Sequence, residues 1–133
     1  MSSYATTAEF DVHGIRPEAL PATISTANKE AFIEAASCRA DSYLGSQFHL
    51  PLTAWGLDIT QAVCAIAAYE LVASLLIFQP EASENKNLTD RRDAAIRWFE
   101  QVAANKAHPV DAIDTAPTAS SVSRVASKTP RGW

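Results

Sequence analysis

The sequence predicts an all-α protein, a small bundle of about four helices followed by an extended C-terminal tail. Residues 57–78 form the longest apolar stretch, and their apolar positions recur at helical spacing of three and four. Shorter stripes of the same period occur in residues 25–44 and 88–105, between residues that start and stop helices. We expect a helical domain over residues 1–107 and an interaction tail over residues 108–133.

The first two helices are predicted from their end signals. Residues 4–14 form a short helix capped by Thr6 or Thr7, because a threonine oxygen accepts a bond from the free amides of the first turn. The second helix starts between residues 25 and 28 and runs to Leu44. Gly45 is expected to end it in the left-handed conformation.

The stretch over residues 57–78 is apolar on most of its circumference, which is typical of a central core helix or a membrane span. Its uninterrupted apolar run, between Gln61 and Glu70, is only eight residues, whereas a span needs about 20. We therefore expect a core helix and no membrane association. Asp58 or Thr60 is the expected cap, and Pro80 the expected stop.

The segment of residues 46–56 places large apolar side chains in a loop. These groups must pack on something, either as a roof over their own bundle or as a contact to another subunit. Trp55 is the first choice for such a contact. The candidate inter-subunit residues are Phe48, Leu50, Pro51 and Trp55.

A further helix is predicted over residues 88–105, after the polar segment EASENKN. Asn87 or Thr89 is its expected cap. Its predicted buried stripe consists of Ile96, Phe99, Val102 and Ala103.

Charge divides the chain into an acidic body and a basic tail. Residues 1–114 hold all 15 acidic and eight of the 11 basic residues, a formal charge of −7, whereas residues 115–133 carry +3. The tail has no helical period, yet it holds valines, bases and a final tryptophan, so we expect it to order on a partner, by adding to a sheet edge or by wrapping a groove. The candidate partner-binding residues are Val122, Arg124, Val125, Lys128, Arg131, Gly132 and Trp133.

Motifs for catalysis, cofactors or metals are missing from the sequence: it has no glycine-rich phosphate loop and no HExxH. His13, His49 and His108 lie in separate segments, and Cys38 and Cys64 are expected to be buried thiols. We expect no catalytic, cofactor-binding or metal residues, and hence no enzyme. Glu70 is expected to pair with an arginine of a neighbouring helix, for which the candidates are Arg39, Arg92 and Arg97.

Three segments, residues 36–52, 63–71 and 91–106, resemble in order and spacing the head-tail joining proteins of Mu-like tailed phages and prophages. Two departures are a short region between the first two helices and Gln47, where that family usually has arginine. The matching positions are Asp41, Tyr43, Leu44, Phe48, Leu50, Pro51 and Leu52, then Ala65, Ala68 and Tyr69, then Ala95, Ile96, Arg97 and Trp98, and finally Arg131, Gly132 and Trp133.

This resemblance implies an adaptor, or head-completion, protein that forms a ring, typically a dodecamer, under the portal. Such a ring extends the DNA channel and docks the tail. The implied partners are the portal protein, other copies of the chain and a downstream neck or tail protein. DNA would pass without specific binding, because an acidic lumen offers no cations to phosphate. The implied location is the virion neck, after assembly in the host cytoplasm.

Two alternatives remain open. One is a stopper or tail-terminator protein lower in the neck, although such proteins are usually richer in β-structure. The other is a small helical regulatory protein that binds nucleic acid. Three basic charges in the tail would give such a protein only weak and strongly salt-dependent binding.

Overall fold

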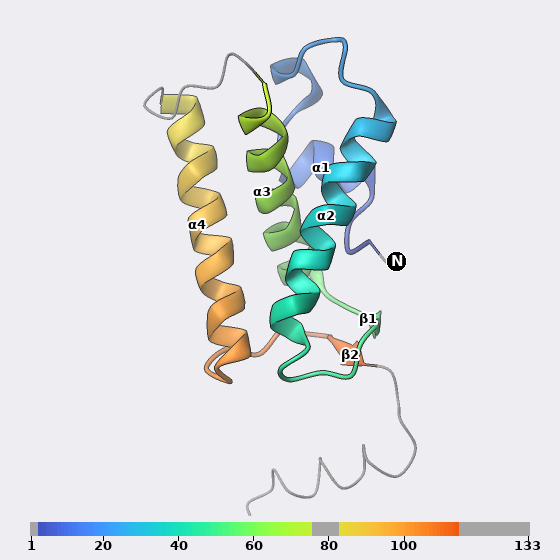
Figure 1. Cartoon of the computed structure of the whole chain (residues 1–133), viewed down its shortest axis with the longest axis vertical. Coiled ribbons are helices and arrows are strands. Elements are labelled where there is room, and N and C mark those ends of the chain that lie inside the picture. Colours follow the sequence, from blue (N-terminus) through green and yellow to red (C-terminus); the bar gives the residue numbers. More distant parts are fainter. Residues whose placement is uncertain (1–2, 76–82, 115–133) are drawn as a thin grey trace, which may run out of the picture.

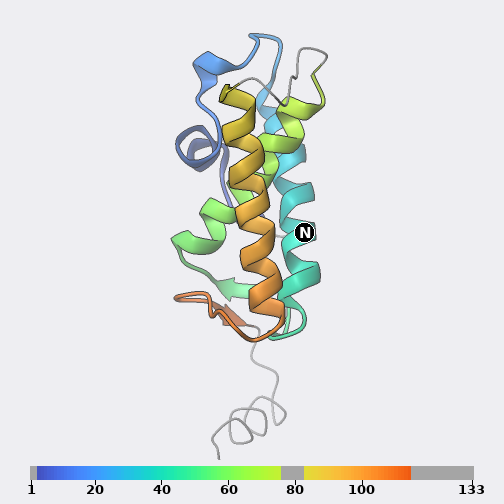
Figure 2. The same cartoon turned by 90° about the vertical axis from the view of Figure 1, so that its left-hand side faces the viewer.

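A computed structural model describes residues 3–75 and 83–114 (Figure 1). In this part of the chain, α2 (Thr26–Leu44), α3 (Leu57–Ala73) and α4 (Ser83–Ala103) lie side by side along the long axis. The short helix α1 (Thr7–His13) lies across them, and a 3-10 turn, η1 (Pro17–Ala19), follows it. Two short strands, β1 (Leu52–Ala54) and β2 (Ile113–Asp114), pair antiparallel at one end of the bundle (Figure 2). The predicted all-α bundle is confirmed, with this small ladder added.

Helix α3 is the centre of the fold, as its apolar circumference predicts, and it packs against α1, α2 and α4. Burying each large aliphatic side chain contributes about 1.5–3 kcal/mol, while its small alanines let the neighbouring helices approach closely. The buried residues of α3 are Ile59, Thr60, Val63, Cys64, Ala65, Ile66, Ala67, Ala68, Leu71 and Val72. The helix ends at Ala73, earlier than expected. Pro80, the expected stop, lies outside the described residues.

The starts of α1 and α2 are capped by local hydrogen bonds. Thr6 is the cap of α1: its Oγ1 accepts from the amide of Glu9 (3.1 Å), while the Glu9 carboxylate accepts from the amide of Thr6 (2.9 Å). Ser25 and Asn28 form the same reciprocal pair at the start of α2. Each pair satisfies two amides that the first turn of a helix leaves without partners.

Two predicted helix ends are wrong in their details. Gly45 is right-handed, with φ −60°, because the chain continues in a turn in which the Phe48 amide donates to the Leu44 carbonyl (2.9 Å). Gly56 occupies the cap position of α3 and makes no side-chain cap bond. Asp58, an expected cap, instead joins α3 to a distant segment.

Helix α4 begins at Ser83, several residues before the expected start near Leu88. The helix therefore includes the polar residues before Leu88, and one of them, Lys86, pairs with Asp90 one turn on (3.8 Å). In the predicted stripe, Phe99 and Val102 are fully buried and Ile96 is half-buried. None of the described helices has the length and apolar character needed to cross a membrane.

Candidate interaction surfaces

Tyr4 anchors the N-terminal segment to three other parts of the chain. Its side chain is fully buried, and its amide donates to Ser37 Oγ (3.0 Å). Its carbonyl accepts from Thr60 Oγ1 (2.9 Å) and from Trp55 Nε1 (3.2 Å). Its hydroxyl donates to the carboxylate of Asp41. Asp41 is itself half-buried.

Burial also sets the protonation of two groups in this core. Burial raises the pKa of Tyr4 above the usual range, and the hydrogen bond to Asp41 and the charge of Asp41 raise it further. The Tyr4 hydroxyl therefore stays neutral and remains a donor. Burial raises the pKa of the Cys64 thiol to about 12, with a smaller contribution from the charge of Glu9. Cys64 is buried as expected, whereas Cys38 is exposed, so the expectation of two buried thiols is wrong for Cys38.

The apolar loop of residues 46–56 packs largely on its own bundle. Phe48, Leu50 and Trp55 are partly buried against the core, while Pro51 is exposed. The Trp55 ring meets that of Tyr4 edge to face, with centroids 4.8 Å apart at 84°. Three of the four candidate inter-subunit residues therefore contribute to the roof of the bundle and keep only part of their surface exposed.

Asp58 fastens the segment after α4 to the start of α3. Its Oδ1 accepts from the amide of Ile59 (2.8 Å) and its Oδ2 accepts from the amide of Val110 (2.7 Å). Gly56 permits the close approach, since a Cβ there would lie 2.7 Å from the Val110 carbonyl oxygen. Sequence reasoning missed this contact because it joins residues 52 positions apart.

The described part of the predicted tail, residues 108–114, is held against the bundle. In the ladder, Leu52 pairs with Asp114 and Ala54 with Ile113, and Thr53 Oγ1 donates to the Ile113 carbonyl (3.1 Å). The end of α4 is fixed by a bond from Gln47 to the Ala103 carbonyl (3.1 Å). The seven candidate partner-binding residues, Val122, Arg124, Val125, Lys128, Arg131, Gly132 and Trp133, lie outside the described residues.

Three large apolar side chains are exposed at this end of the bundle. We call Leu57, Val110 and Ile113 the basal apolar patch; their exposed fractions are 55%, 65% and 58%. They belong to the start of α3 and to the segment that Asp58 and the ladder hold beside it. Sequence reasoning did not single them out, because they share one end of the bundle only through the pairing of the two strands.

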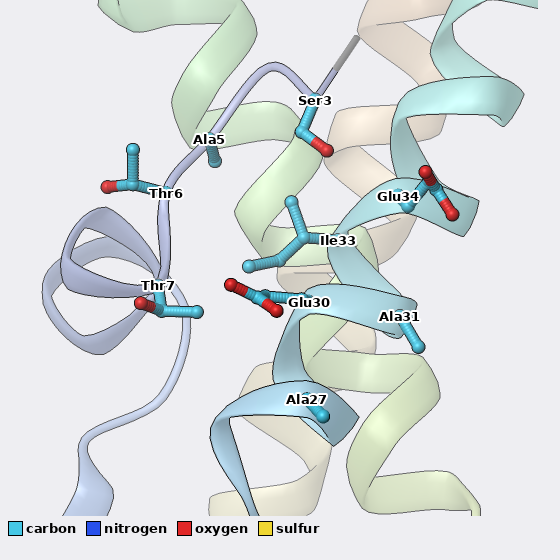
Figure 3. A pocket seen from close by; sticks show the side chains of 9 residues that line it. All are labelled: Ser3, Ala5, Thr6, Thr7, Ala27, Glu30, Ala31, Ile33 and Glu34. Atoms are coloured by element: carbon cyan, nitrogen blue, oxygen red, sulfur yellow. The ribbon is translucent and has the colours of Figure 1, made fainter. Parts of the chain in front are cut away.

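A groove of about 590 Å³ separates the N-terminal segment from α2 (Figure 3). Glu30 and Glu34, one turn apart on α2, are exposed, and no residue in the described ranges forms an ion pair with either. The lining residues are Ser3, Ala5, Thr6 and Thr7 on one side and Ala27, Glu30, Ala31, Ile33 and Glu34 on the other.

Two arginines of α4 have structural partners. Arg91 donates to the carbonyls of His13 and Gly14 (2.9 Å to Gly14), closing the end of α1. Arg92 lies over the Tyr69 ring, 4.1 Å from its centroid. Its Nε is 2.9 Å from the Asp93 carboxylate, in an ion pair without hydrogen-bond geometry.

Within the described ranges, Glu70 pairs with none of its three candidate arginines, Arg39, Arg92 and Arg97. No three His, Cys, Asp or Glu side chains of residues 3–75 and 83–114 gather as metal ligands.

Comparison with known families gives one match of nearly full length. Residues 5–127 match the model of a protein family described as Bacteriophage Mu, Gp36. A search of curated proteins gives no match. The matched range includes the loop of residues 46–56, the basal apolar patch and every lining residue of the groove except Ser3.

Proposed function

The chain belongs to this Mu phage family, and on that premise we propose that it is an adaptor that forms a ring under the portal. Family membership supports a structural or assembly protein of a Mu-like phage and, with it, a virion component. The finer role is our proposal: the ring extends the DNA channel, lies in the virion neck and docks a downstream neck or tail protein. This role requires no catalysis, and we propose none.

The basal end of the bundle is the observation that best supports this role. The basal apolar patch exposes three large side chains on segments fixed by Asp58 and by the ladder. Residues 115–133, with their three bases, continue directly from β2 at this same end. An apolar surface at the end of the bundle from which a basic segment continues is suited to a protein partner, because apolar area supplies affinity and charges supply orientation. We assign this partner as the portal.

The tail provides a way to time assembly. At low concentration the free subunit remains a monomer, and its tail gains most of its affinity when it orders on the portal. Subunits bound side by side are then at a high local concentration, so ring contacts that are weak in solution become effective. The acidic body, with a formal charge of −7 over residues 1–114, would leave DNA free to pass.

Portal binding tests this proposal. Native mass spectrometry compares the full chain and a variant that ends at Asp114, each alone and after mixing with portal rings of the same phage. We expect the full chain to change from a monomer to a portal-bound ring, and the shortened chain to stay monomeric with unchanged helical circular dichroism. A full chain that never binds portals would contradict the adaptor role and favour one of the two alternatives, a protein of the lower neck or a regulatory protein that binds nucleic acid. A DNA-shift assay at low salt separates these two alternatives.

The patch has its own test within the full chain. Replacing Leu57, Val110 and Ile113 together by serine should weaken portal binding at least tenfold, which corresponds to about 1.4 kcal/mol. The matched control is Val12→Ser on α1, where the side chain is 76% exposed and lies outside the patch. Equal binding by the triple variant and the control would exclude the patch as the portal contact.

A further inference from the structure

The groove between the N-terminal segment and α2 combines a small-residue lining with an acidic border (Figure 3). Ala27 and Ala31 leave room along α2, and the buried Ile33 contributes to the lining. Glu30 and Glu34 stand one turn apart on this border. The geometry accepts a segment with small or branched side chains and with cations at its edge.

A positive partner would stabilise Glu30 and Glu34. Like charges one turn apart on a helix repel each other and weaken it. The nearest base in the sequence, Lys29, is committed to Asp11 at 2.9 Å. Within residues 3–75 and 83–114, no cation offsets the two carboxylates.

Residues 115–133 have the complementary chemistry. They carry no acid, and Arg124 and Lys128 supply two cations for the two carboxylates of the groove. Val122 and Val125 are small enough for the groove, and the remaining composition is mainly Ala, Ser and Thr. Charge and side-chain size therefore both match the groove.

Chain length allows the contact. At about 3.3–3.6 Å per residue, the ten residues from Asp114 to Arg124 span up to roughly 35 Å. Helix α2 is only about 28 Å long at 1.5 Å per residue. The lining residues of α2, from Ala27 to Glu34, belong to its N-terminal half, and Figure 1 shows that this half is remote from the ladder. The tail is therefore long enough to reach the groove of a copy that lies alongside.

We propose that Arg124 and Lys128 of one copy dock on Glu30 and Glu34 of the next copy, in this groove. The inference rests on the proposed ring, because a ring needs a contact between two different surfaces of the same chain. A groove and a segment that leaves from the opposite end provide such a pair. Arg131, Gly132 and Trp133, farther along, remain available to the portal.

Cross-linking of isotope-labelled copies tests the contact directly. Equal amounts of full chains labelled with ¹⁴N and with ¹⁵N are mixed and treated with a zero-length carbodiimide, and the products are analysed by mass spectrometry. One sample contains the chains alone at high concentration and low salt, and a second contains the chains bound to portals. We expect cross-links from Lys128 to Glu30 or Glu34, with about half of them joining chains of different label. Cross-links within single chains only, or none between these residues in either sample, would overturn the proposal.

Charge-reversed variants provide a second test, in which sedimentation velocity measures the self-association of the full chain at low salt. A groove variant (Glu30→Lys with Glu34→Lys) and a tail variant (Arg124→Glu with Lys128→Glu) should each lose self-association, and their mixture should regain it. Docking of a tail in its own groove would give no such rescue. The matched control, Glu18→Lys with Glu100→Lys, makes the same charge change at exposed sites outside the groove and should associate as the parent does. Loss of association in this control, or no rescue in the mixture, would contradict the proposal.

Portal binding separates this inference from the proposed function. Portal binding without the cross-link would reject the groove contact and leave the adaptor role intact. The cross-link between free copies without portal binding would reject the adaptor role and leave the contact standing.

Discussion

The hydroxyl of Tyr4 donates a hydrogen bond to the carboxylate of Asp41, 37 positions along the chain, and this bond ties the N-terminal segment to α2. Tyr4 is fully buried and Asp41 is half-buried. A partly desolvated carboxylate is stabilised by a neutral donor, and the raised pKa of Tyr4 keeps that donor in place. The wall of the groove formed by residues 3–7 is thus anchored by a polar contact in the core.

Tyr4→Phe should destabilise the protein by about 1–3 kcal/mol, because it keeps the ring and leaves Asp41 without its donor. Urea unfolding followed by circular dichroism measures the loss. In the Asp41→Asn background the same substitution should cost less, since the uncharged amide depends less on the donor. An equal cost in both backgrounds would show that the two side chains are not coupled.

Stability should fall in alkaline solution. Cys64 has an ordinary pKa of 9.0, and burial raises its pKa to about 12 in the folded state. The folded chain therefore holds the thiol proton in a range where the unfolded chain loses it. The stabilisation is complete below pH 9.0 and is lost as the pH rises from there toward about 12. Tyr4 has the same sign and adds to the loss above its ordinary value of 10.0.

Urea unfolding at a series of pH values between neutrality and strong alkali measures this loss. Cys64→Ala removes a titrating group, so its free energy of unfolding should decline less steeply than that of the parent. Cys38→Ala is the matched control because Cys38 is exposed, and it should follow the parent curve. A parent that is equally stable throughout the alkaline range would contradict the burial argument.

Asp58→Asn should release the segment after α4. The amide group offers one acceptor oxygen in place of two, so it cannot serve the amides of both Ile59 and Val110. We expect faster hydrogen exchange at the Val110 amide and a stability loss of about 1 kcal/mol. Nuclear magnetic resonance of the labelled protein measures both. Asp90→Asn, in an exposed ion pair of α4, is the control and should leave Val110 unchanged.

Gly56→Ala should disturb the same junction by crowding. The added Cβ would lie 2.7 Å from the backbone oxygen of Val110, so one segment must move, at a cost of about 1–3 kcal/mol. Thermal unfolding measures the change. Gly45→Ala is the matched control: its backbone is right-handed helical and its Cβ would lie 3.2 Å from the Asp41 carbonyl oxygen. A Gly56 variant as stable as the Gly45 variant would argue against close packing there.

The sequence by itself determined the helical class and the central helix, and it restricted the caps of α1 and α2 to a few neighbouring residues. Thr6 with Glu9, and Ser25 with Asn28, are pairs three residues apart, so their bonds form within one turn and are visible as patterns. The apolar period of residues 57–78 likewise predicted α3 as the core. The family resemblance predicted a Mu-like phage protein, and the family match confirms this coarser identity.

Only the tertiary structure decided how distant residues are used. Asp58 looked like a cap and bonds to Val110, and Cys38 looked buried and is exposed. The apolar loop around Trp55 packs partly on its own bundle, whereas Leu57, Val110 and Ile113 are exposed together at one end. Periodicity reports only neighbours a few residues apart, so contacts across 33 to 78 positions, such as Tyr4 to Ser37 and Arg91 to His13, leave no such pattern. Burial and partner choice at these sites follow from which helix faces meet, and that is fixed when the whole bundle packs.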